Sequence, residues 1–142
     1  PNAREVADSW TPLHISAYWG HISAIGPLLT AGARVDALDT DERTALILAA
    51  GSGRTAVVEA LVAAGADVNH GDVDGHTALQ EVSWYGCWDA ARVLVLAGAV
   101  VAVRNKEGKR PIDEVRALVG SNCAHHACMY ACFHTCLVRR YA

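Results

Sequence analysis

The feature that most constrains this chain is a spacing of 33 residues shared by two unrelated sequence landmarks. The first reads "TPLH" from position 11, "TALI" from 44, "TALQ" from 77 and "RPID" from 110. The second is "AGA", which begins at positions 31, 64 and 97. A fixed period of about 20 to 50 residues indicates repeated units that bury their apolar faces by stacking on one another. The chain is therefore predicted to form a linear array.

Each landmark also predicts a helix boundary. A threonine hydroxyl can cap the free N–H groups at a helix start, and this role suits Thr11, Thr44 and Thr77. A glycine just beyond a helix can adopt the left-handed conformation that closes it, and this role suits Gly32, Gly65 and Gly98. Between the landmarks, apolar residues recur at helical spacing. Each repeat therefore reads as a pair of helices with a buried face.

The segments that follow the glycines are typical of tight turns. They read "DALDTDERT", "DVNHGDVDGHT" and "VVAVRNKEGKR", and they are rich in Asp, Asn and Gly. We expect them to project from the helices as hairpin loops. Glu42 stands where the two later loops have a glycine.

With this period and the "TPLHISA" signature, residues 6 to 119 resemble the ankyrin repeat family. The resemblance implies an all-α solenoid of helix pairs with projecting β-hairpin loops over residues 1–120. It also implies that His14 and His21 hydrogen-bond between repeats, so we expect no catalytic role for them or for His76. The predicted units are repeats near 6–38, 39–71 and 72–104, a partial repeat over 105–120, and a cysteine-rich capping helix over 121–142.

Two stretches depart from the family pattern. Pro27 falls within "SAIGPLL", where its ring would clash with a preceding carbonyl unless the helix starts late. We therefore predict a helix start near Ser23 or Ala24. In the third repeat, Glu81 to Ser83 replace small alanines.

Aromatic pairs end the first predicted helix of repeats one and three. Aligning the repeats on their threonines makes Tyr18–Trp19, Gly51–Ser52 and Trp84–Tyr85 equivalent. The resemblance places these positions and the loop tips on a concave, partner-binding face, and Tyr and Trp are enriched among binding hot spots. The alternative is that the aromatics only pack on a neighbouring loop. The predicted partner-binding residues are Trp10, Tyr18, Trp19, Asp41, Arg43, Gly51, Ser52, Asp74, His76, Trp84, Tyr85, Glu107 and Lys109.

Several function classes find no support in the sequence. The 12 basic residues are spread along a chain of net charge −3, so we expect no nucleic-acid partner. No apolar run is long enough for a transmembrane helix. "GSGRT" at 51–55 imitates a phosphate loop but lacks its lysine and follows a predicted helix. We therefore expect neither an enzyme nor a bound cofactor.

The tail "SNCAHHACMYACFHTCLVRR" holds four of the five cysteines. If it is one helix, Cys128 and Cys136 lie about 12 Å apart along its axis, too far to ligate one ion. A two-ligand site of neighbouring cysteines such as Cys128 and Cys132, completed by His125, Cys87 or a partner, is one alternative, and a disulfide is another. The favoured interpretation is that the cysteines are buried thiols of a helix that caps the last repeat.

The sequence thus predicts a non-enzymatic module that binds another protein, as a free adaptor or as a fixed scaffold subunit of a larger complex. A metal- or redox-responsive protein using the Cys/His tail is the alternative, and a structural spacer is a third. Reduced thiols favour an intracellular location, in the cytosol or an organelle. No signal peptide precedes the first repeat and the chain begins at Pro1, so we expect a processed chain or a fragment.

Overall fold

The computed structural model describes residues 10–110, which form six helices and contain no strand. The predicted capping helix, with its candidate metal ligands, lies outside this range. No helix within the range combines the length and apolar character needed to cross a bilayer. The helices are α1 (Pro12–Trp19), α2 (Ile22–Thr30), α3 (Ala45–Gly51), α4 (Thr55–Ala63), α5 (Ala78–Tyr85) and α6 (Trp88–Leu96).

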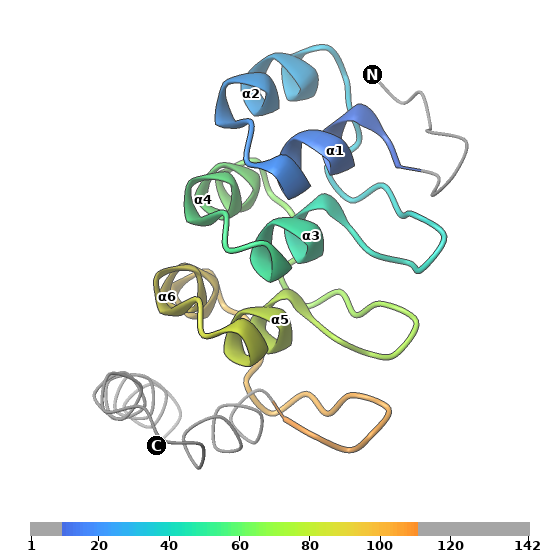
Figure 1. Ribbon diagram of the computed structural model, residues 1–142, viewed down its shortest axis with the longest axis vertical. Coiled ribbons are helices and arrows are strands. Elements are labelled where there is room, and N and C mark those ends of the chain that lie inside the picture. Colours follow the sequence, from blue (N-terminus) through green and yellow to red (C-terminus); the bar gives the residue numbers. More distant parts are fainter. Residues whose placement is uncertain (1–9, 111–142) are drawn as a thin grey trace.

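The helices stack as three antiparallel pairs in two layers (Figure 1). Helices α1, α3 and α5 form one layer, with α3 in contact with both of the others. Helices α2, α4 and α6 form the second layer, each packed on the first helix of its own pair. The loops between the pairs project from the same edge of the stack. This is the all-helical solenoid that the 33-residue spacing predicts.

The predicted caps start and close these helices. Thr11, Thr44 and Thr77 are the N-caps of α1, α3 and α5, and each hydroxyl accepts a hydrogen bond from a backbone N–H in the first turn. The second helices end two residues before Gly32, Gly65 and Gly98, which all have positive φ. The starts and ends of the helices therefore recur with the repeat period.

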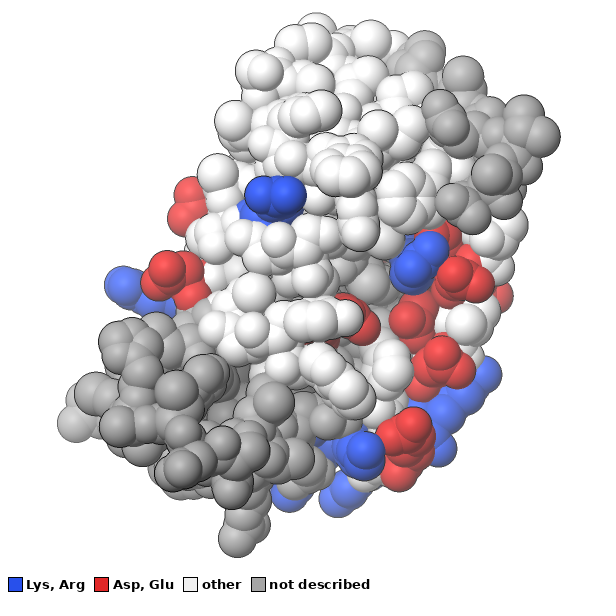
Figure 2. Space-filling model, in the orientation of Figure 1, with Lys and Arg blue, Asp and Glu red and all other residues white. Residues whose placement is uncertain are grey.

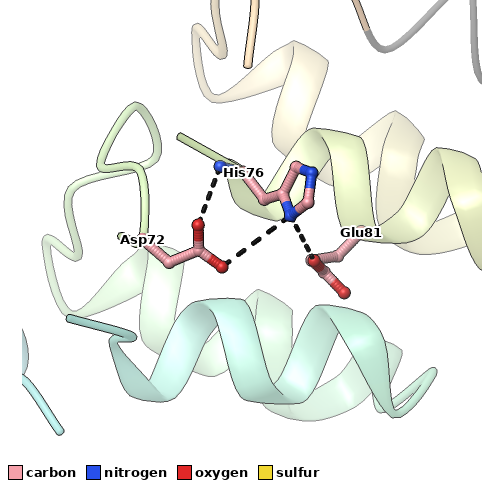
Figure 3. Close-up of side chains that lie close together, drawn as sticks. All are labelled: Asp72, His76 and Glu81. Carbon is pink, nitrogen blue, oxygen red and sulfur yellow. Dashed lines mark hydrogen bonds and ion pairs between the residues drawn. The ribbon is translucent and has the colours of Figure 1, made fainter. Parts of the chain in front are cut away.

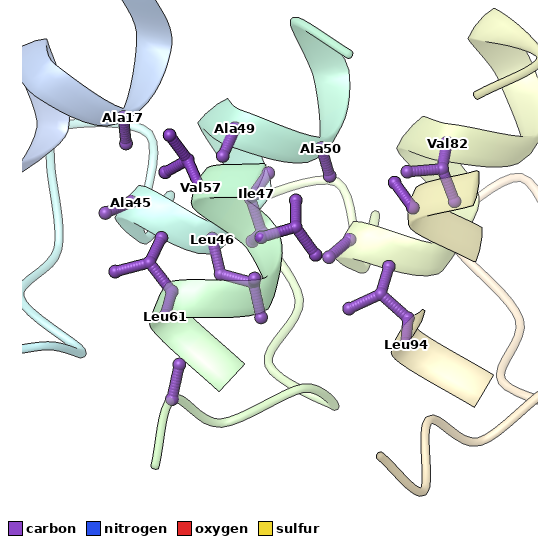
Figure 4. Close-up of a cluster of buried hydrophobic side chains, with 14 of the residues drawn as sticks. Ala17, Ala45, Leu46, Ile47, Ala49, Ala50, Val57, Leu61, Val82 and Leu94 are labelled. Atoms are coloured by element: carbon purple, nitrogen blue, oxygen red, sulfur yellow. The ribbon is translucent and has the colours of Figure 1, made fainter. Parts of the chain in front are cut away.

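Leucine and alanine side chains form one continuous core between the two layers (Figure 4). Leu46, Leu61, Leu79 and Leu94 are fully buried, and the small Ala49 and Ala50 let neighbouring helices approach closely. Burying a leucine contributes about 1.5 to 3 kcal/mol. Because the core runs through all three pairs, each repeat is stabilised mainly by its neighbours.

A polar side chain in the first turn of α1 and α5 ties its repeat to the next loop. His14 Nδ1 accepts from the Thr11 N–H at 3.0 Å, and His14 Nε2 lies 3.1 Å from the Arg43 carbonyl. Gln80 repeats both bonds, accepting from Thr77 N–H at 3.0 Å and donating to the Lys109 carbonyl at 2.9 Å. The middle repeat has Ile47 at this position, so this link is missing there.

Two expectations about the first repeat are wrong. Helix α2 starts at Ile22, so Pro27 stands inside it as its sixth residue. Pro27 and Ser23 are both exposed, so water can reach the Ser23 carbonyl that the missing N–H of the proline leaves without an intrahelical partner. His21 is exposed at the N-cap of α2 and its side chain makes no capping bond. Of the two histidines, only His14 links repeats.

One side chain organises each projecting loop. The Oδ1 atom of Asp39 accepts hydrogen bonds from the backbone N–H groups two and four residues later, at 2.9 and 2.8 Å. Asp72 and Asn105 repeat this arrangement in the next two loops. An isolated bridge between Gly71 and Thr77 is the only β-pairing in the described range. The loops are thus hairpin-like turns without strands.

Candidate functional site

The predicted aromatic pairs are exposed at the ends of α1 and α5. Gly20 and Gly86 follow these helices in the left-handed conformation and stop them directly after Trp19 and Tyr85. Trp19 is 58% exposed and Tyr85 is 61% exposed. The two helix ends therefore hold large aromatic side chains in contact with solvent.

A groove of about 510 Å³ opens between these two helix ends. Six of the predicted residues line it: Tyr18, Trp19, Gly51, Ser52 and Tyr85 at the helix ends, and Arg43 from the loop side. Figure 2 shows this face as largely uncharged over the helices, with both signs of charge interleaved over the loops. Trp84 is half exposed but is not among the lining residues.

Gly51 keeps the floor of the groove low. A Cβ added there would lie 3.1 Å from Glu81 Oε2 and 3.8 Å from a ring carbon of Tyr85. Its φ is not in the left-handed region, so backbone conformation does not require glycine here, and an added Cβ would displace the end of the Glu81 side chain by a few tenths of an ångström. A larger side chain at this position would fill the groove between the aromatic walls.

Trp10 belongs to a network that joins the first helix to the following loop. Its Nε1 donates to Asp39 Oδ2 at 3.0 Å, and the Arg43 guanidinium lies 5.9 Å from its ring centroid. Its ring centroid is also 5.2 Å from that of Tyr18. These contacts give Trp10 a structural role next to the groove.

The loop tips carry acid–base pairs two residues apart. In the second repeat, Arg43 lies 2.9 Å from Asp39 and 3.1 Å from Asp41. In the fourth, Lys109 lies 2.9 Å from Glu107. The third repeat has Asp74 and His76 at these positions, without a permanent cation. The predicted loop-tip residues therefore share one edge of the array.

The sequence did not predict a convergence of two carboxylates and an imidazole beside the groove (Figure 3). His76 Nδ1 lies 3.9 Å from Asp72 Oδ2 and 3.9 Å from Glu81 Oε1. Asp72 and Glu81 line the groove, as do Ile47, Leu48 and Arg54. The signal that could have found them is the replacement of the apolar Leu48 by Glu81 one repeat later.

Burial raises the pKa of the Glu81 carboxyl, and the charge of Asp72 adds to this shift while His76 opposes it. No described residue donates a hydrogen bond to the Glu81 carboxylate. It is therefore a partly desolvated acceptor without a donor in the described part of the chain.

Metal and thiol chemistry find limited support. Asp72, His76 and Glu81 each offer one ligand atom within 4.8 Å of the others, the one such group in residues 10–110. Burial raises the pKa of the Cys87 thiol, which leaves it protonated and weakly nucleophilic at neutral pH. The candidate ligands His125, Cys128 and Cys132 lie outside the described residues.

The helix pairs, their period and the shared loop geometry agree with a comparison against protein families. The family described as "Ankyrin repeats (3 copies)" matches residues 13–105. The chain belongs to the ankyrin repeat family. Ankyrin repeats generally mediate protein–protein interactions and are typically non-enzymatic. A search of curated proteins finds no match for this ankyrin repeat chain.

Proposed function

We propose that this ankyrin repeat protein binds a segment of a partner protein in the concave groove, as a non-enzymatic adaptor or as a fixed subunit of a larger complex. One observation carries the proposal: exposed aromatic side chains at the ends of α1 and α5 flank a groove with a floor of Gly51 and Ser52.

The energetics favour binding over a purely structural role. Tyr and Trp supply large contact area with few rotatable bonds, and hot spots concentrate on such residues around a desolvated pocket. Tyr18 and Trp19 also hold each other edge to face, with ring centroids 5.2 Å apart. Because Tyr18 and Trp19 already hold each other in place, their side chains lose little conformational entropy when a partner docks.

The partner should be found and mapped with three variants of the intact chain. Affinity capture followed by mass spectrometry identifies proteins retained by the wild type. Gly51→Leu should abolish this retention by filling the groove, and Trp19→Ala should weaken the purified complex by at least about 2 kcal/mol. Leu96→Ala is the control, because Leu96 is equally exposed but lies on α6, away from the groove.

Retention that survives both groove variants, with their folding intact by circular dichroism, would refute the proposal. The mass of the native complex on size exclusion distinguishes an adaptor from a fixed subunit. The proposed setting for this binding is inside the cell, where cysteines are kept reduced.

A further inference from the structure

We infer that the groove takes a basic side chain from the partner, whose cationic head is received by Asp72 and Glu81. This inference rests on the proposed function and specifies the chemistry of the bound segment. It starts from the convergence of Asp72, His76 and Glu81 on a space beside the aromatic walls (Figure 3).

The repeats themselves show that a cation is missing at this place. Asp39 Oδ2, the equivalent of Asp72 Oδ2, is paired with Arg43 Nε at 2.9 Å. In the third repeat the position of Arg43 is held by His76, whose Nδ1 is 3.9 Å from Asp72 Oδ2 and therefore too distant for a hydrogen bond. The carboxylate of Asp72 is only 9% exposed, so water covers little of it.

Glu81 adds a second acceptor on the groove side. It occupies the position that Leu48 holds one repeat earlier, and its carboxylate is 23% exposed. No side chain in residues 10–110 donates a hydrogen bond to it. Of the two arginines that line the groove, Arg43 is paired with Asp39 and Asp41, and Arg54 donates to the Tyr18 carbonyl. Two half-buried carboxylates without a permanent cation favour an incoming positive charge.

The spacing fits a nitrogen cation without rearrangement. An ammonium or guanidinium nitrogen contacts oxygen at about 2.7 to 2.9 Å and can therefore reach both carboxylates at once, because their oxygens lie within 4.8 Å of each other. Tetrahedral ligands of zinc, at about 2.0 to 2.2 Å from the ion, lie about 3.3 to 3.6 Å from one another, so a metal would require these side chains to close in. The apolar stem of a lysine or arginine would lie along the rings of Trp19 and Tyr85, which also line the groove.

The test uses a phage-displayed library of random linear peptides selected against the intact chain. We expect the selected peptides to share a basic residue, and its replacement by norleucine should weaken binding at least about tenfold. Asp72→Asn and Glu81→Gln should each weaken the basic peptide by a similar factor but leave the norleucine peptide unaffected. Glu59→Gln, on the exposed surface of α4, is the charge-matched control.

The Asp72→Asn variant should keep its fold, because Asn105 accepts the same two backbone hydrogen bonds in the next loop. The inference would be overturned if the norleucine replacement, or both acid variants, left the affinity unchanged while Trp19→Ala weakened it. The proposed function would still stand in that case. If no selected peptide binds less tightly to Trp19→Ala or Gly51→Leu, both the inference and the proposed function would be overturned. Binding that disappears with a chelator would identify a metal site and also overturn the inference.

Discussion

Replacing His14 by glutamine should remove one acid-sensitive contribution to stability while preserving the local hydrogen bonds. Burial lowers the pKa of His14 below its ordinary value of about 6.5, and the Arg43 carbonyl only partly opposes this. Its Nδ1 accepts a hydrogen bond from the Thr11 N–H, so a proton on that atom would break this bond. The folded chain therefore holds the neutral imidazole.

The sign of the pH dependence follows from this shift. Below the unfolded pKa of about 6.5, the unfolded chain binds a proton at His14 that the folded chain does not. The contribution is fully present above that pH and is lost as the pH falls towards the folded pKa. One proton difference corresponds to a slope of at most about 1.4 kcal/mol per pH unit.

Gln80 shows that glutamine can replace the imidazole. Its Oε1 accepts from the N-cap N–H of Thr77 and its Nε2 donates to the Lys109 carbonyl, which are the two roles of His14 two repeats earlier. His14→Gln should therefore keep stability within about 1 kcal/mol at pH 7.5. His14→Ala should lose roughly 2 to 4 kcal/mol, because it leaves a buried N–H and a carbonyl without partners.

The assay is urea unfolding followed by far-ultraviolet circular dichroism, from about pH 8 to about pH 5. Subtracting the wild-type free energy of unfolding from that of His14→Gln cancels the titration of all other groups. The difference should move in favour of the variant as the pH falls below about 6.5. A constant difference, or one that moves towards the wild type, would refute the assigned tautomer and burial.

Three further predictions concern the array and its tail. Glu42→Gly should raise the free energy of unfolding by roughly 1 kcal/mol, because Glu42 has φ 58° where Gly75 serves the next loop; an unchanged urea midpoint would contradict the strain. Leu61→Ala should cost roughly 2 to 5 kcal/mol through a core cavity, and a loss below about 1 kcal/mol would contradict the packing. If the tail cysteines are packed thiols, replacing them by alanine should harm stability less than replacing them by serine, and a chelator or reductant should not change the thermal midpoint of the wild type.

The sequence predicted the features that repeat and missed those that depend on contacts between elements. Threonine caps and closing glycines act within a few residues, so their roles could be read locally. The link from Trp10 to Asp39 spans 29 residues and depends on loop geometry that no local pattern reports. Pro27 was misjudged because its cost depends on exposure, which the sequence does not give.

The sequence likewise predicted only part of the candidate site. Periodic alignment placed Trp19, Gly51 and Tyr85 at equivalent helix ends, and the structure brings them to one groove. Asp72 and Glu81 come from a loop and a helix, at different positions in the repeat, so alignment could not relate them. They meet because the turn pairs Asp72 with His76 shortly before α5 begins, and Glu81 lies in the first turn of that helix.

Isoleucine at position 47 leaves the joint between the second and third repeats without the helix-to-loop hydrogen bond that His14 and Gln80 make in their repeats. The helix-to-loop hydrogen bonds made by His14 and Gln80 are directional and resist rotation, whereas apolar burial is not directional and tolerates small rotations. The two walls of the groove stand on opposite sides of this joint, on α1 and on α5. Loop hydrogen bonds still join these two repeats, from the Val73 N–H to the Asp41 carbonyl and between His70 Nε2 and the Glu42 carbonyl. We therefore expect the separation of the walls to adjust to segments of different thickness by small rotations about this loop edge.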